Sequence, residues 1–259
     1  MSTPVRYRIE DGLATVSIVD TDRRNVLTPA VVDGLIDALS AAEHARCLVL
    51  RGEGEVFCGG GDVVGIASHV AGDLTTAAVL DRLERIDDLI ERLFRFPAPT
   101  VAAVDGPAFG TGGALVLACD LAVAATSGQI GFGFAQLGMA PAGGTSALLP
   151  RAVGPSTARE LLFTGELLGT DRANDLGLFD RVYDTTAFRT GVASLVDAVL
   201  TGGHAPNREA KRVLRESYEQ SIAAAMAAER AAQRRLLETD AHRDRVRTFL
   251  DGGGLDSGE

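Results

Sequence analysis

The sequence predicts an α/β fold followed by a helical C-terminal segment. Short apolar runs at 45–52 and 99–106 have the length and composition of strands buried on both faces. Strand, glycine turn and helix then recur three or four times along the chain. The residues from about 186 to 250 read as helix, with one glycine–proline break near TGGHAPN.

Each element has a local signal. Residues 5–19 alternate in polarity around an Asp-Gly pair, which predicts a β-hairpin. Thr28 and Pro29 predict a helix start, because threonine is a good N-cap and proline is favoured at the first helical position. The other elements expected are strands at 45–52, 99–106 and 177–184, a strand–turn–strand at 121–133, and helices at 74–95, 110–120, 155–163 and 171–176.

These elements predict a core over residues 1–185 that holds the functional site. Residues 186–250 form a helical region for oligomerisation or for a lid. The tail 251–259, DGGGLDSGE, has little to bury and is expected to be disordered.

Composition excludes several classes of protein. A formal net charge of −10 argues against a nucleic-acid partner. No apolar run reaches the roughly 18–20 residues that span a bilayer, and the N-terminus lacks a signal pattern. We therefore expect a cytoplasmic protein without a membrane partner. The three cysteines lie in apolar stretches, which favours free thiols, and no Cys or His spacing predicts a metal site.

Two glycine loops, FCGGGD at 57–62 and FGTGG at 109–113, share one pattern: each ends a buried strand and leads towards a helix. A helix start leaves free N–H groups and a partial positive charge. Two such ends brought together can form an oxyanion hole. Ordinary glycine turns remain an alternative. A phosphate site has less support, because GTGGAL lacks the lysine of a P-loop and completes no dinucleotide pattern.

Five segments together resemble the crotonase, or enoyl-CoA hydratase/isomerase, superfamily over nearly the whole chain. They are RRNVLTPAVVDGLIDAL, VLRGEGEVFCGGGDV, PTVAAVDGPAFGTGGALVLACDLAVAA, LGMAPAGGTSALLPRAVG and LLFTGELLGTDRANDLGLFDRV. The resemblance implies a crotonase-type spiral of ββα units with a C-terminal helical region, assembled as a homotrimer or hexamer. It also implies an acyl-CoA thioester ligand, with no cofactor beyond the coenzyme A moiety.

The resemblance also implies roles for residues of the two loops. The N–H groups of Gly61 and of Thr111, with its neighbour Gly112, match the oxyanion donors of the family. The residues around Gly61 are expected to contact the CoA thioester; they are Gly59, Gly60, Asp62 and Val63.

The chain departs from the family where the hydratases carry two glutamates. These positions are Ala114 and Phe134, neither of which can move a proton. Syn-hydration by the usual mechanism is therefore not expected. Enolate chemistry remains, with double-bond isomerisation first and decarboxylation or C–C cleavage next. Gln136 is expected near the pocket but cannot titrate.

A replacement acid or base is expected from the segment after the first loop. The candidates are His69, Asp73, Asp81, Glu84, Asp87 and Asp88, each of which can instead belong to a solvated helix face. Asp62 is expected to cap or brace its loop, and Asp120 is expected to be structural.

Coenzyme A contacts are predicted for Arg24 and for Phe249 in the C-terminal helix. Gly252 stands where the family often has a lysine, so an acyl-carrier thioester is a second possible substrate. Two alternatives to the enolate enzyme stay open. One is a non-catalytic acyl-CoA-binding protein, and the other is a hydratase whose water is activated by unusual residues.

Overall fold

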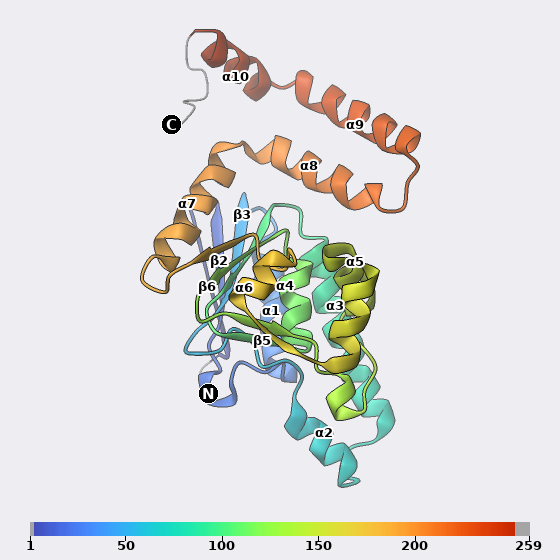
Figure 1. The fold of residues 1–259 in the computed structure, drawn as a ribbon. Coiled ribbons are helices and arrows are strands. Elements are labelled where there is room, and N and C mark those ends of the chain that lie inside the picture. The colour runs from blue at the N-terminus through green and yellow to red at the C-terminus, as the bar shows by residue number, and fades with distance from the viewer. Residues whose placement is uncertain (1–2, 252–259) are drawn as a thin grey trace. The chain divides into compact units, whose positions relative to one another are not determined.

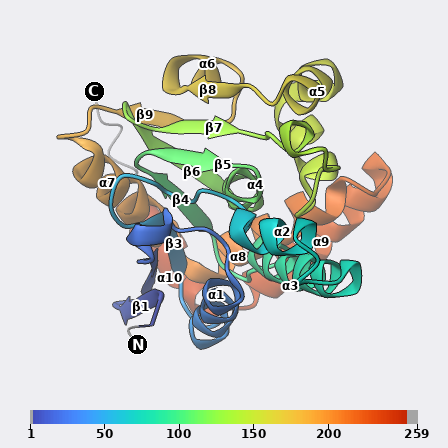
Figure 2. The same cartoon turned by 90° about the horizontal axis from the view of Figure 1, so that it is seen from below.

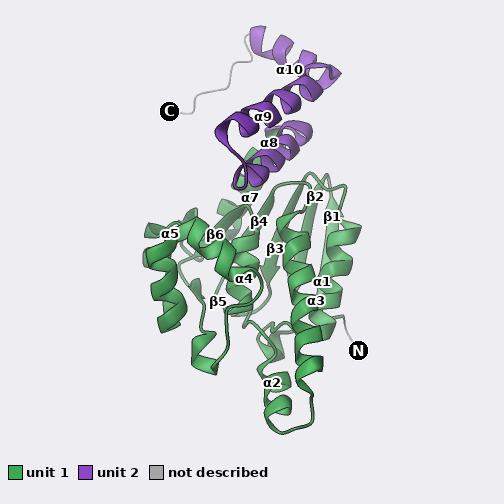
Figure 3. Cartoon of the chain, turned by 90° about the vertical axis from the view of Figure 1, so that its right-hand side faces the viewer, with its two compact units in different colours: residues 1–201 green, residues 202–259 purple. Residues whose placement is uncertain are grey.

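The computed structural model describes residues 3–251 of the chain. Within them the chain divides into two compact units, the first ending at Thr201 and the second beginning at Gly202 (Figures 1 and 3). In this described range, no helix has the length and apolar character needed to cross a membrane.

The first unit is built on a large, mostly parallel sheet (Figure 1). Its strands lie in the order β1-β2-β3-β4-β6-β9. They are β1 (Val5–Glu10), β2 (Leu13–Ile18), β3 (Cys47–Gly52), β4 (Thr100–Val104), β6 (Leu121–Ala125) and β9 (Arg181–Tyr183). The hairpin of β1 and β2 is antiparallel, as expected, and the other neighbours are parallel. Asp11 and Gly12 both have positive φ, the backbone that a two-residue hairpin turn requires.

A second, smaller sheet consists of β5 (Pro107–Phe109), β7 (Gln129–Gly131) and β8 (Leu167–Gly169). Neither β5 nor β8 was among the strands expected from the sequence. Both strands are three residues long, so they contain too few residues to show an alternating pattern. Their pairing is set by contacts far apart in the sequence.

The helices of the first unit cover both faces of the large sheet. They are α1 (Pro29–Ala41), α2 (Val63–Val70), α3 (Thr76–Phe94), α4 (Thr111–Ala118), α5 (Thr145–Thr164), α6 (Thr170–Asp175) and α7 (Phe188–Thr201). The first glycine loop was expected to lead towards a helix, but the bounds of α2 were not predicted from the sequence. The helix expected at 155–163 is the second half of α5, which bends at Gly154, where φ is 78°.

Alternating residues of the strands divide between two cores. Leu48 and Leu50 of β3 face the larger core, which includes α1, α3 and α4. Val49 faces the smaller core, which includes Phe188 and Leu195 of α7. Figure 2 shows α7 on one side of the sheet and α1 and α4 on the other. The unit therefore extends to Thr201 and not only to residue 185 as expected, because α7 covers a sheet face that would otherwise be exposed.

Helix α4 lies inside the larger core. It is buried around its whole circumference, and it is made of small and apolar residues that suit such a position. It begins at Thr111, within the second glycine loop. The fold thus holds the free amides of one helix start in a rigid, apolar environment.

The second unit contains α8 (His204–Ser217), α9 (Ile222–Leu237) and α10 (Asp240–Leu250). Arg235 of α9 binds Glu209 of α8 through two hydrogen bonds of 2.9 and 2.7 Å, and Arg212 adds two more of 3.1 and 3.0 Å. These contacts, led by the Arg235 hydrogen bond, lower the pKa of Glu209 to about 2. Residues 252–259, which include most of the expected disordered tail and Gly252, lie outside the described residues.

Replacing Thr28 tests the cap of α1. The Thr28 hydroxyl accepts a hydrogen bond of 3.3 Å from the N–H of Val31. We expect Thr28→Ala to be less stable than Thr28→Ser by about 1 kcal/mol, because both lack the methyl group but only serine keeps the acceptor. Calorimetry should then give a Tm about 3 °C lower for the alanine variant. Equal Tm values for the two variants would contradict a capping role.

The Glu209 pair predicts a pH-dependent stability of the second unit. Its folded pKa, about 2, is below the unfolded value, so its contribution is complete above about pH 5 and is lost as pH falls towards 2. Glu209→Gln should therefore lower the opening free energy of α8 and α9 by about 1 kcal/mol at pH 7. The difference should shrink towards pH 4. Hydrogen exchange of the full chain measures both values.

Glu229→Gln is the matched control for this prediction. Glu229 is an exposed residue of α9 without an ion pair in the described part of the chain. If Glu229→Gln lowered the hydrogen-exchange protection of α8 and α9 as much as Glu209→Gln does, the contact between Glu209 and Arg235 would have no special role in stability.

Candidate active site

A cavity of about 480 Å³ opens in the first unit where the two glycine loops meet. The first loop contributes Gly59, Gly60 and Gly61, and the second contributes Gly110 and Thr111. Residues from α1, α2, α3 and the segment 133–142 complete the wall.

Backbone hydrogen bonds join the two loops side by side. The N–H of Cys58 donates to the carbonyl of Pro107 at 3.2 Å, and the N–H of Phe109 donates to the carbonyl of Cys58 at 3.0 Å. Cys58 and Ala108 therefore pair like neighbours in a parallel sheet. Because this pairing is made by the main chain, it fixes the residues that follow in each loop relative to one another.

The glycines permit this close approach, each in a different way. Gly60 has a φ of 94°, and a Cβ there would lie 2.4 Å from the carbonyl oxygen of Phe109. A Cβ on Gly112 would lie 2.2 Å from the carbonyl oxygen of Cys58. Gly112 thus lets α4 pack against the first loop, and it is not among the residues of 3–251 that line the cavity.

Gly61 and Thr111 face each other across the base of the cavity. A Cβ on Gly61 would lie 3.9 Å from the hydroxyl oxygen of Thr111. Thr111 is the first residue of α4, so its N–H lies before the first intrahelical hydrogen bond, in which Ala114 donates to Gly110. Within residues 3–251, neither Gly61 nor Thr111 uses its N–H in a backbone hydrogen bond. Both amides are available to a ligand oxygen.

Ala114 and Phe134, the two positions at which the resemblance places the hydratase glutamates, are both apolar and buried. Phe134 lines the cavity and is 8% exposed. Ala114 is fully buried behind the wall. A Cβ on Gly143 would lie 3.2 Å from the Cβ of Ala114. Gln136 lines the cavity, and its side-chain amide donates to the carbonyl of Gly165 at 3.0 Å. None of these three side chains is an acid or a base.

Most of the remaining wall is hydrophobic. The apolar lining residues outside the loops are Leu27, Pro29, Val32, Val63, Ile66, Leu74, Val79, Leu83, Ile86, Phe109, Leu137, Met139 and Ala142. Burial against such a surface favours an apolar ligand group.

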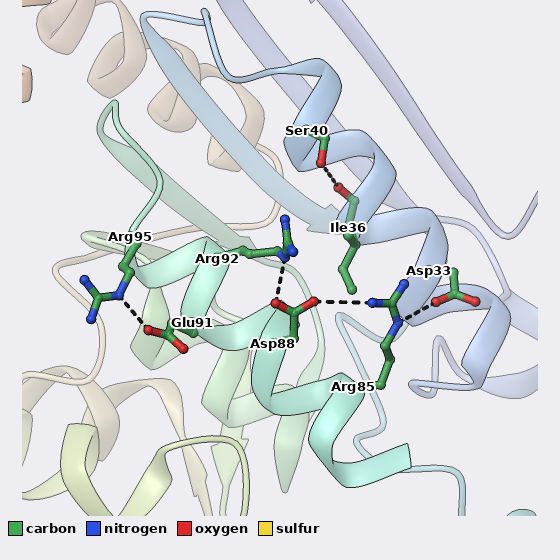
Figure 4. Close-up of polar contacts among 8 residues, drawn as sticks. All are labelled: Asp33, Ile36, Ser40, Arg85, Asp88, Glu91, Arg92 and Arg95. Atoms are coloured by element: carbon green, nitrogen blue, oxygen red, sulfur yellow. Dashed lines mark hydrogen bonds and ion pairs between the residues drawn. The ribbon is translucent and has the colours of Figure 1, made fainter. Parts of the chain in front are cut away.

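The charged groups of the wall are largely paired. Arg85 of α3 bonds to Asp33 of α1 at 3.0 Å and also contacts Asp88 at 3.4 Å, as Figure 4 shows. Asp62 contacts Arg23 at 3.3 Å and Arg82 at 3.9 Å. Asp62 thus braces its loop through ion pairs, and its side chain makes no capping hydrogen bond to α2.

Asp81 differs from the other two aspartates of the wall. It is an exposed residue of α3 that lines the cavity, and within the described residues its carboxylate has no ion pair or hydrogen bond. Of the six acid or base candidates predicted from the sequence, all of which are described, only Asp81 lines the cavity.

The other five candidates lie elsewhere. Asp87 accepts a hydrogen bond of 3.2 Å from the N–H of Gly143, so it supports the loop behind the wall. Asp88 binds Arg85 and Arg92 (Figure 4). His69 Nδ1 lies 2.8 Å from the carbonyl oxygen of Leu74. Asp73 and Glu84 are exposed residues outside the lining set of the described chain. Asp120 bonds to the N–H and hydroxyl of Thr100, which agrees with its expected structural role.

Some of the residues predicted to contact coenzyme A line the cavity, and others lie elsewhere. Gly59, Gly60, Asp62 and Val63 line the cavity. Arg24 instead lines a separate polar hollow of about 600 Å³, together with Asn25 and Glu53. Phe249 lies on α10 in the second unit and is 60% exposed.

Cys58 lies beneath the loops as an inert thiol. Burial raises its pKa to about 12, although a hydrogen bond from the backbone of Gly60 opposes the rise. The thiol is therefore protonated at neutral pH, and it packs the loops together without acting as a nucleophile.

Sequence reasoning missed Asp33, Arg82 and Arg85 in the cavity wall. Their charged side chains resembled the solvated face of an amphipathic helix. One signal could have found them. The buried faces of α1 and α3 pack into one core, so the residues at the edges of these faces lie at the same cavity.

The chain is similar to known proteins over most of its length. The family model described as Enoyl-CoA hydratase/isomerase matches residues 8–254. The chain is 33% identical over 205 residues to the enoyl-CoA isomerase/hydratase fer4 of Mycosarcoma maydis, which covers 79% of this chain and 73% of that protein. It is 30% identical over 257 residues to the mitochondrial methylglutaconyl-CoA hydratase of Mus musculus, covering 95% and 79% respectively.

A crystal structure of an enoyl-CoA hydratase from Polaromonas sp. JS666 superimposes with a TM-score of 0.90 at 27% identity. The superposition covers 96% of this chain and 97% of that one. The match of the family model over most of the chain, together with this shared architecture, shows that the chain belongs to the enoyl-CoA hydratase/isomerase family and has the crotonase fold.

Proposed function

We propose that the chain is an acyl-thioester enzyme that forms an enolate and moves a double bond, in preference to adding water. One observation supports this above the others. The free amides of Gly61 and Thr111 meet at a cavity lined by Phe134, with Ala114 buried behind its wall, and these are the two positions at which the resemblance places the hydratase glutamates. The site can polarise a thioester carbonyl but lacks the carboxylate pair that holds water.

The two amides stabilise charge that develops on the thioester oxygen. Each oxyanion donor typically lowers the barrier by about 3 kcal/mol. The apolar wall strengthens this effect, because little water competes inside the cavity. The start of α4 adds a partial positive charge at the same point. As electrons move from the α C–H bond to the oxygen, the adjacent carbon becomes acidic.

Asp81 is the group that we assign to proton transfer. Its carboxylate takes a proton from the α-carbon of a 3-enoyl thioester, and the electron pair delocalises into a dienolate. The same carboxylic acid then returns the proton to the γ-carbon, which gives the 2-enoyl isomer without a net change of atoms. Asp33 and Asp62 suit this step less well, because arginines hold them.

The cavity also indicates the substrate class. Its lining favours an apolar acyl group over an acyl group with a second carboxylate. The thioester carrier is coenzyme A, with an acyl-carrier protein as the alternative, and no further cofactor is needed for the step. From the family resemblance we also propose a homotrimer or hexamer, in which the C-terminal helices serve assembly or act as a lid.

A 3-enoyl-CoA with an apolar chain tests the reaction. With trans-3-octenoyl-CoA in deuterated, ¹⁸O-labelled water, we expect conversion to the 2-enoyl isomer with a kcat of about 1–10³ s⁻¹. Mass spectrometry should show deuterium at carbon but no product that contains ¹⁸O. Hydration at a similar rate would overturn the argument from the missing glutamates. Binding without deuterium exchange on any thioester would instead support a binding protein.

Asp81→Asn tests the proton-transfer group. We expect kcat to fall by about 10²–10⁴, the usual contribution of a general base. The Tm should not fall, because Asp81 is exposed and has no partner in the described chain. Glu84→Gln is the control, since Glu84 lies on the same helix away from the cavity wall, and its kcat should change less than about twofold. A normal kcat for the Asp81 variant would remove it from the mechanism.

A further inference from the structure

The hydroxyl group of Thr111 is a buried polar group without a partner. Thr111 is 4% exposed, and within the described residues its Oγ1 has no hydrogen bond. Leaving a buried hydroxyl unpaired costs stability, so such groups are rare and call for an explanation. The explanation has to be local, because α4 is packed inside the core on all sides.

The side chain of Thr111 is oriented by packing. Its methyl carbon Cγ2 lies 3.7 Å from the position that a Cβ on Gly143 would occupy, on the side of the loop behind the wall. Its Oγ1 lies 3.9 Å from the corresponding position on Gly61. Thr111 also lines the cavity. The methyl group therefore lies on the side of Gly143, and the hydroxyl lies beside Gly61 of the first glycine loop.

The usual local partner is not open to this hydroxyl. A helical threonine commonly bonds to the carbonyl three or four residues earlier. Thr111 is the first residue of α4, so the residues three and four earlier, Ala108 and Pro107, belong to strand β5 and not to a preceding helical turn. The hydroxyl can instead be satisfied by a ligand atom in the cavity.

We propose that Thr111 Oγ1–H donates a third hydrogen bond to the thioester oxygen, beside the N–H groups of Gly61 and of Thr111 itself. This inference rests on the proposed function, since it requires a thioester oxygen at that point. A neutral carbonyl oxygen has two lone pairs, which the two amides occupy. An enolate oxygen carries more charge and accepts a further, shorter bond. The hydroxyl therefore stabilises the enolate more than the bound substrate.

Two variants separate the hydroxyl from the shape of the side chain. Thr111→Val keeps the branched shape and loses the oxygen, whereas Thr111→Ser keeps the oxygen. With 3-octenoyl-CoA, we expect the valine variant to lower kcat by about 10²-fold. Its KM should change less than about threefold, and its Tm should not fall, because an unpaired polar group has been removed. The serine variant should keep kcat within about threefold.

A binding measurement tests the same point without turnover. The probes are a CoA thioether that ends in a nitronate, whose anionic oxygen imitates the enolate, and the neutral alkyl thioether of equal length. We expect the wild type to prefer the nitronate. Thr111→Val should bind the nitronate at least about tenfold more weakly and should bind the alkyl thioether unchanged. Titration calorimetry gives each Kd.

The outcomes distinguish the two proposals. If the wild type prefers the nitronate and Thr111→Val keeps the full preference, the third donor is wrong and the two amides suffice. If the wild type does not distinguish the two probes, the oxyanion hole itself is wrong, and the inference on Thr111 fails with it. A tenfold loss confined to the nitronate supports the hydroxyl as a donor.

Discussion

The main-chain pairing of Cys58 with Pro107 and Phe109 is the constraint on which the site depends. It holds two loops, about fifty residues apart in sequence, at a distance that side chains would prevent. Gly60 and Gly112 are required there, because a Cβ on either would collide with a carbonyl oxygen of the other loop. The amides of Gly61 and Thr111 follow in fixed positions. Because backbone hydrogen bonds set the positions of these two amides, the side chains of the cavity wall can differ without moving them.

The wall then selects which reactions the polarised carbonyl can undergo. Arginines pair with Asp33 and Asp62, and this pairing ties α1, α3 and the first loop together at the cavity. Asp81 has no such partner in the described chain. One free carboxylate is enough to carry a proton between two carbons of a ligand. Under the proposed function, adding water would need a second acidic or basic group to hold the water molecule while the first protonates the adjacent carbon.

The sequence predicted best those elements that depend on residues close together in the chain. Thr28 and Pro29 marked the start of α1, and Asp11 and Gly12 the first hairpin, because these residues act on their own backbone. Strands β5 and β8 were missed because partners distant in sequence form them. The glycine loops showed that two helix starts could meet. Which of six acidic or basic residues reached the cavity could not be read from the sequence, since it depends on how α3 packs against α1.

Position 111 shows how one side chain in a rigid loop can alter chemistry without altering the fold. Any residue except proline supplies an N–H there, and a glycine supplies nothing more. Threonine adds a hydroxyl, and the core around α4 fixes its orientation by enclosing the methyl group. Because the cavity has few other polar atoms, we propose that this hydroxyl adds to the stabilisation of negative charge on the ligand oxygen. Under the proposed function, a third donor strengthens the oxyanion hole, and stabilising the enolate is then the main catalytic effect of the site.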